Sequence, residues 1–215
     1  MMIGLPETTE MNRPLPKKAI FDKFKPNPTD RQRFDAEIHR LTIVNEVSTL
    51  TTTIAAGECI NTFFVVLVSL RGEECSKKSL ELLAKLISQN MLFVLEYEDK
   101  ARLAVYRAGK VIQSEWKPLD EWKIKLTGLN FDTVWENVIT QIGDVEIAVG
   151  RSLDEQLAAD DEREKLLQRI ERLEKQARDE KQPRRKWELV EEGRKLREGN
   201  SKQIKKEQEN NVKLH

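Results

Sequence analysis

The chain has few of the residues that build covalent or metal-bound frameworks. Its 215 residues include two cysteines, Cys59 and Cys75, and two histidines, His39 and His215. Two cysteines are too few for a disulfide framework, and the histidines leave no zinc site and no histidine-based triad to predict. We therefore expect no resident metal and no cofactor, and we interpret His39 as structural.

Excess charge and long apolar runs are also missing. Lys and Arg, 37 in all, balance 37 Asp and Glu, so the formal net charge is zero. This balance argues against a polybasic protein that binds nucleic acid over its whole surface. No segment has the roughly 18 consecutive apolar residues of a membrane helix, and the first residues do not form a secretory leader. We predict a soluble, cytoplasmic protein that does not enter a membrane.

What the chain does have is a marked contrast in charge between its two parts. Residues 151–215 carry 18 basic and 16 acidic side chains, about half of that segment, whereas about a quarter of residues 1–150 are charged. A segment so rich in charge can bury little of itself. We therefore expect a folded core followed by a solvated helical arm.

The N-terminal residues are rich in proline. Five of the seven prolines lie in residues 1–28, which predicts an extended N-terminal arm with a short helix near residues 17–24, anchored on the core by Phe21 and Phe24. A second short helix is expected after Thr29, which would cap it. The remaining predicted segments are a mixed α/β core over 29–150, a helical hairpin over 151–199 and a disordered tail over 200–215.

The core segment predicts a mixed sheet with packing helices, an α/β (α+β) fold. The apolar run of residues 60–70 has no alternation, which is typical of a central strand buried on both faces. A helical stripe over 76–89 and a second apolar strand over 91–97 complete a parallel, right-handed β-α-β unit. Antiparallel strands follow at the edge of the sheet. The clearest helix covers residues 131–142, where six apolar residues share one face and should pack on the sheet.

The charged arm predicts a helical hairpin. Leu166, Ile170, Leu173 and Ala177 follow the 4-3-4 spacing of an antiparallel coiled coil, and Pro183 interrupts the helix. The hairpin would place six basic side chains near its turn, where they could contact phosphates or a partner, although a charged, solvated tip is the simpler interpretation. These residues are Lys175, Arg178, Lys181, Arg184, Arg185 and Lys186.

No familiar catalytic motif is present, because the sequence contains no phosphate-binding GxxxxGK[ST], GxGxxG, HExxH or GxSxG pattern. One alternative comes from architecture: a β-α-β core whose strand ends in acids followed by Lys is similar to restriction-type nucleases. There, carboxylates bind Mg²⁺ and the Lys steadies the attacking water. Glu96, Glu98 and Lys100 are the candidates, with Glu96 and Glu98 expected on one strand face. A solvated turn is the simpler interpretation of these three residues. Asp132 and Glu136 share a helix face, and we interpret them as the solvent side of that helix rather than as catalytic residues.

The order of several segments resembles a known protein family. These are MIGLPETTEMNRPLPKK at the start, NMLFVLEYEDKARLAVYR followed by SEW, LTGLNFDTVWENVITQI, and RIERLEKQARDEKQPRRKWELVEEGRKL near the end. Together they are similar to the bacterial and archaeal family called domain of unknown function 4391. The resemblance implies no catalytic residues. It implies an association with helicases and DNA methyltransferases of restriction-like or phage-defence systems.

The missing catalytic motifs and the uneven charge favour a non-enzymatic accessory subunit. We expect it to dock on a larger protein partner, a helicase or DNA methyltransferase, with the hairpin as a protein-binding or DNA-contacting arm. Two alternatives stay open. The first is a metal-dependent nuclease that uses Mg²⁺, and the second is a hairpin that pairs with another copy of the chain to form a homo-oligomer.

Overall fold

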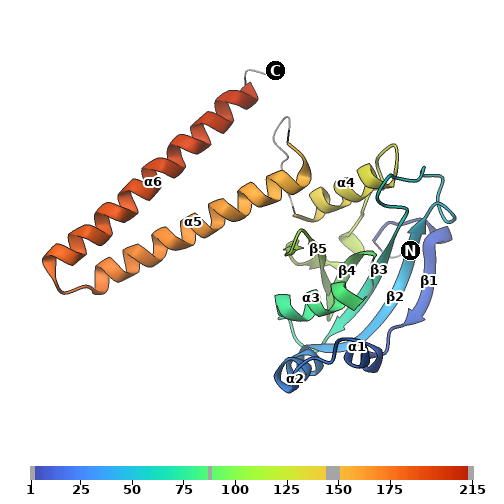
Figure 1. Cartoon of the computed structure of the whole chain (residues 1–215). Coiled ribbons are helices and arrows are strands. Elements are labelled where there is room, and N and C mark those ends of the chain that lie inside the picture. Colours follow the sequence, from blue (N-terminus) through green and yellow to red (C-terminus); the bar gives the residue numbers. More distant parts are fainter. Residues whose placement is uncertain (1–2, 87–88, 144–150, 213–215) are drawn as a thin grey trace. The chain divides into compact units, whose positions relative to one another are not determined.

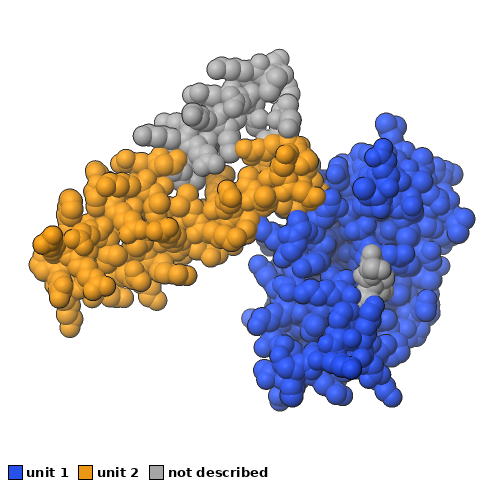
Figure 2. All heavy atoms as spheres, viewed as in Figure 1, with its two compact units in different colours: residues 1–145 blue, residues 146–215 orange. Residues whose placement is uncertain are grey.

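The computed structural model describes residues 3–86, 89–143 and 151–212, and the chain divides into two compact units, residues 1–145 and 146–215 (Figures 1 and 2). The predicted boundary at residue 150 lies outside the described residues. Within the described ranges, no helix combines the length and apolarity needed to cross a bilayer.

Unit 1 contains a mixed sheet with the order β1-β2-β3-β4-β5-β6. Strands β3 and β4 are parallel, and the other described neighbours, including β7 on β5, are antiparallel. This arrangement confirms the predicted mixed sheet around a β-α-β unit. The strands are β1 (Glu10–Pro14), β2 (Ile38–Ser48), β3 (Thr62–Leu70), β4 (Asn90–Tyr97), β5 (Lys100–Arg107), β6 (Lys110–Gln113) and β7 (Lys117–Pro118).

Helices cover both faces of this sheet. On one face, α1 (Lys17–Phe24), α2 (Pro28–Glu37) and α3 (Lys77–Leu86) share a core with Val66 and Val68 of β3. Successive side chains of a strand point to opposite faces, and Phe63 packs on the other face against Trp135 of α4 (Phe131–Gly143), with ring centroids 5.0 Å apart. Both faces of β3 are therefore buried, as its unbroken apolar run predicts.

The stripe on α4 is core, as predicted. Its six apolar residues, Phe131, Val134, Trp135, Val138, Ile139 and Ile142, are each at most 2% exposed. The Asn130 side chain accepts a hydrogen bond from the backbone N–H of Thr133 (3.0 Å) and caps the helix. Local sequence alone was sufficient here because the apolar spacing and the cap indicate the same helix.

The N-terminal segment is part of the sheet rather than a separate extended arm. After the short 3-10 helix η1 (Glu7–Thr9), β1 pairs with β2 at the edge of the sheet. Pro14 is the last residue of β1. Its lack of a backbone N–H is tolerated because an edge strand is hydrogen-bonded on one side only. Phe21 is buried and makes an edge contact with Phe34 at 5.5 Å, whereas Phe24 is half-buried. Helix α2 begins earlier than expected, because Asn27 rather than Thr29 caps it.

Asp132 connects α4 to a loop that is distant in sequence. Its carboxylate accepts hydrogen bonds from the backbone N–H groups of Glu58 (2.6 Å), Cys59 (3.2 Å) and Ile60 (2.8 Å). A side chain at Gly57 would place its Cβ 2.5 Å from this carboxyl group, so a larger residue there would displace the carboxylate from the loop. The interpretation of Asp132 as a simple solvent-side residue is therefore incomplete, because sequence spacing does not reveal which loop reaches the carboxylate.

Unit 2 contains two long helices, α5 (Leu153–Asp179) and α6 (Pro183–Val212), joined by residues 180–182 as the predicted hairpin (Figure 1). A capping box of Ser152 and Glu155 begins α5. Its buried residues include Ile170, Leu173 and Ala177 of the predicted stripe.

Helix α6 extends beyond its predicted end. The sequence predicts a helix end near residue 198 and disorder over residues 200–215. In the structure, α6 continues to Val212. The segment after Asn200 is rich in Lys, Gln and Glu. These residues have high helix propensity, so a shortage of apolar residues does not by itself end a helix.

We expect the substitution Asp132→Ala to lower the free energy of unfolding of unit 1 by about 1–2 kcal/mol, because three backbone donors lose their charged acceptor and only water can replace it. Urea denaturation followed by tryptophan fluorescence measures this change. The matched control is Glu136→Ala, one turn along α4, which should stay within about 0.5 kcal/mol of wild type. Equal effects of the two substitutions would show that the contact between Asp132 and the loop is not stabilising.

Candidate functional site

The three nuclease candidates lie around the turn between β4 and β5. Glu96 is on β4, half-buried, and accepts a hydrogen bond from the Ser69 hydroxyl (3.2 Å). Glu98 lies beyond the end of β4, exposed and in a left-handed conformation (φ 56°), while Lys100 begins β5 opposite Tyr97. The expectation that Glu96 and Glu98 share a strand face is wrong, because the chain already reverses at Glu98.

The described residues contain no group of three or more His, Cys, Asp or Glu side chains that could hold a metal ion. Glu96 and Glu98 belong to no such group. A nuclease role for these three residues stays a hypothesis from the sequence.

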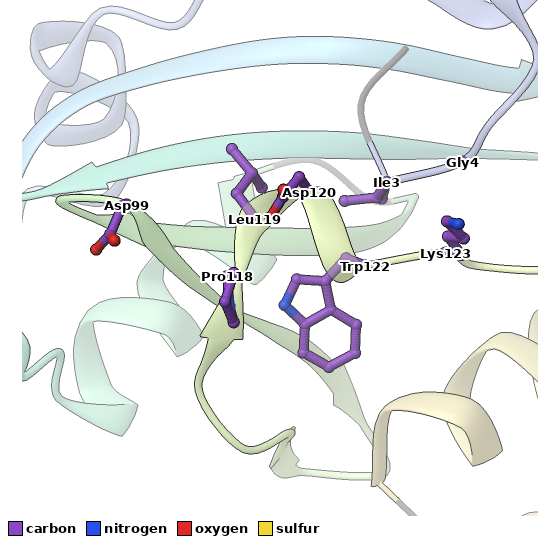
Figure 3. A pocket seen from close by; sticks show the side chains of 8 residues that line it. All are labelled: Ile3, Gly4, Asp99, Pro118, Leu119, Asp120, Trp122 and Lys123. Atoms are coloured by element: carbon purple, nitrogen blue, oxygen red, sulfur yellow. The ribbon is translucent and has the colours of Figure 1, made fainter.

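An open depression of about 980 Å³ lies beside the same turn (Figure 3). Its acidic lining residues, Asp99 and Asp120, come from two different segments, the β4–β5 turn and the short 3-10 helix η2 (Leu119–Glu121). The Trp122 ring is engaged within the protein, since its indole N–H donates to the Ala101 carbonyl (2.9 Å) and the Lys117 ammonium lies 5.0 Å from its centroid. The lining residues are Ile3, Gly4, Asp99, Pro118, Leu119, Asp120, Trp122 and Lys123. They include no cysteine, serine or histidine.

The two cysteines are not paired: Cys59 is exposed and Cys75 is half-buried. Burial and the neighbouring Glu37 carboxylate raise the pKa of the Cys75 thiol to about 12, so Cys75 is protonated at neutral pH and a poor nucleophile. Glu37 itself accepts hydrogen bonds from the Ser76 backbone N–H (3.0 Å) and the Ser79 hydroxyl (2.7 Å) at the start of α3. This cluster joins α2 to α3 and is structural.

The six basic residues of the predicted hairpin tip, residues 175–186, are all exposed. Arg184 is 3.5 Å from Glu188, and Arg185 is 3.5 Å from Glu180. Hydrogen bonds from the backbone N–H groups of Gln182 and Lys181, together with the Arg185 charge, hold the pKa of Glu180 below its usual range, so this carboxylate stays ionised. The tip thus contains its own counter-charges, although basic groups are in the majority.

The hairpin also carries a groove that the sequence analysis did not anticipate. We call it the hairpin groove; it has a volume of about 550 Å³ and lies between α5 and α6. Its lining residues are Glu174, Ala177, Arg178, Lys186, Leu189, Val190, Gly193, Arg194 and Arg197. A weak signal in the sequence is the spacing of Trp187 and Val190, three residues apart on a charged helix, and these side chains are 67% and 53% exposed. Large apolar groups this exposed on a charged helix indicate a surface for binding.

A family model described as Domain of unknown function (DUF4391) matches residues 3–199. The chain belongs to this family. The match to DUF4391 covers unit 1 and most of the hairpin, so the lining of the hairpin groove lies inside the family segment. It confirms the family resemblance that the sequence analysis drew. No curated protein and no solved structure matches the chain.

We expect Glu98→Gly to raise the free energy of unfolding by about 0.5–1 kcal/mol, because glycine adopts a left-handed conformation without the steric cost of a Cβ. Thermal or urea denaturation measures this change. The adjacent substitution Asp99→Gly is the matched control. The φ of Asp99 is not positive, so glycine there should only add flexibility and destabilise slightly. A loss of stability in Glu98→Gly would mean that the Glu98 side chain makes a contact worth more than the backbone strain.

Proposed function

We propose that this DUF4391 protein is a non-enzymatic accessory subunit whose helical hairpin docks on a larger protein. One observation carries the proposal. The hairpin presents three exposed large apolar side chains, Leu167 (49%), Trp187 (67%) and Val190 (53%), and Val190 lines the hairpin groove. Two other large apolar side chains of the described residues are more exposed, Leu50 (93%) and Leu129 (92%), but they lie singly in loops of unit 1.

Trp187 is expected to contribute most of the binding free energy. Burying a tryptophan removes up to about 250 Å² from water, so covering the exposed two thirds of this ring would contribute roughly 4 kcal/mol at about 25 cal/mol per Å². Tryptophan and arginine are the residues most often found at the centre of binding interfaces. Both occur on this part of the hairpin, which favours a protein partner.

The family resemblance supports a more specific setting. We infer that the partner is a helicase or DNA methyltransferase of a restriction-like or phage-defence system, that the complex acts in the cytoplasm, and that the hairpin pairs in coiled-coil fashion. The exposed basic residues of the hairpin tip would then lie near DNA when the partner is bound to it. This last contact would be secondary, because Glu180 and Glu188 neutralise part of the tip.

The proposal is tested by co-expressing the full chain with helicase and DNA methyltransferase proteins of the same genome, followed by size-exclusion chromatography and crosslinking. We expect a stable complex with crosslinks in α5 and α6. The double substitution Trp187→Ala with Val190→Ala should weaken it by about 30-fold or more, since central aromatic contacts are worth 2 kcal/mol or more. Leu50→Ala in unit 1 is the control and should leave affinity unchanged.

Two outcomes would contradict the proposal. One is an isolated monomer that forms no complex with any of these proteins. The other is cleavage of DNA by the wild-type protein with Mg²⁺ or Mn²⁺ that is lost in Glu98→Ala and Lys100→Ala, which would support the nuclease alternative instead.

A further inference from the structure

The two faces of the hairpin differ in chemistry. On one face, an ion pair joins Arg169 of α5 to Glu192 of α6 at 2.8 Å. The other face holds the hairpin groove. Leu167 lies seven residues before the groove residue Glu174, and Trp187 lies three residues before Val190, so helical spacing puts both next to the groove. The exposed apolar side chains of unit 2 therefore gather on the groove face.

The floor of the hairpin groove is apolar and has a notch at Gly193. Ala177 and Leu189 line it together with Val190. Gly193 is buried, yet a Cβ added there would meet no atom within 4 Å. The space over Gly193 is thus the unfilled volume of the groove, and it suits an apolar side chain supplied from outside.

The rim of the hairpin groove is basic and only partly neutralised. Arg194 is paired with Glu191 (2.8 Å) and lies 3.9 Å from Glu198, and Arg197 is paired with Glu174. The other two basic residues of the rim, Arg178 of α5 and Lys186 of α6, have no ion-pair partner among the described residues. They lie on facing helices at the end of the groove nearest the tip, so a binding segment would meet uncompensated positive charge there.

We propose that the hairpin groove binds an acidic amphipathic helix of the partner protein. Apolar residues three and four apart would enter the notch at Gly193 and cover Val190 and Trp187, and carboxylates beside them would pair with Arg178 and Lys186. The inference rests on the proposed function, and it adds the chemistry of the segment that is recognised.

The charge and polarity of the hairpin groove favour an acidic amphipathic helix over DNA and over a second copy of the chain. A DNA duplex presents mainly phosphates and sugars and has little apolar surface to cover Ala177, Leu189 and Val190, and its phosphates would meet the carboxylates of Glu174 and Glu191. A second copy packed on this face in a two-fold dimer would bring the same basic rim onto both sides of the interface and would supply no new carboxylate for Arg178 and Lys186, which is electrostatically unfavourable.

The probe is a fluorescein-labelled designed helical peptide with Leu at helical spacing i, i+3, i+4 and i+7, flanked by Glu. Its charge-inverted counterpart, with Lys in place of Glu, and a short DNA duplex are measured in parallel against the full chain by fluorescence anisotropy. We expect the acidic peptide to bind at least about tenfold more tightly than the basic peptide, with an affinity that falls as NaCl rises from about 50 to 500 mM.

Two matched pairs of variants locate the binding. Arg178→Glu with Lys186→Glu should weaken the acidic peptide by about tenfold or more, whereas Arg172→Glu with Lys195→Glu, the same charge change at exposed sites outside the groove, should change it by less than about twofold. Gly193→Leu should block the notch and weaken binding similarly. Gly193→Ala leaves the notch open and should not. Circular dichroism should show that every variant keeps its helices.

Three results would overturn the inference: equal binding of the acidic and basic peptides, tighter binding of DNA that competes with the acidic peptide, or a dimer of the full chain that Gly193→Leu dissociates. Failure of the proposed function is a different outcome, because no partner complex would then form at all. If a partner complex forms and depends on Trp187 but is unaffected by the Arg178–Lys186 and Gly193 variants, the accessory role stands and the acidic-helix inference fails.

Discussion

The strand β3 places Phe63 and Val65 on one face of the sheet and Val66 and Val68 on the other, and all four side chains are fully buried. A strand of this kind needs hydrogen-bonding neighbours on both edges and helices over both faces. Strands β2 and β4 are the hydrogen-bonding neighbours. Helices α1–α3 cover one face, and α4 covers the other. Because the covering helices come from widely separated parts of the sequence, the N-terminal residues and residues 131–143 must both fold onto the same strand.

Two carboxylates hold these covering helices to segments that are remote in sequence. Asp132, in the first turn of α4, accepts the backbone N–H groups of the loop before β3, and Glu37, at the end of α2, accepts the donors at the start of α3. In both cases a negative charge satisfies N–H groups that would otherwise lack a partner at a helix or loop terminus. Asp132, one of the acidic residues singled out in the sequence, therefore has a structural explanation.

Unit 2 follows a different physical rule. Two helices can bury only the stripe along which they meet, here Ile170, Leu173 and Ala177, so the outer faces of a hairpin stay exposed. Most of that outer surface is charged and stable in water. The hairpin groove is the exception, because Gly193 leaves apolar volume unfilled between the helices. The surface most suited to binding thus arises from a missing side chain rather than from a cluster of reactive ones.

The sequence by itself determined the elements whose side-chain pattern is strong and local: the central strand β3, the capped helix α4, the β-α-β unit and the charged hairpin with its turn near Pro183. It missed β1, whose polar residues have no alternation and which becomes a strand only because β2 offers it an edge. It also missed the role of Asp132 and the hairpin groove. Those features depend on which loop or helix arrives from elsewhere in the chain, and periodicity carries no information about contacts between distant segments. Only the tertiary structure decided them.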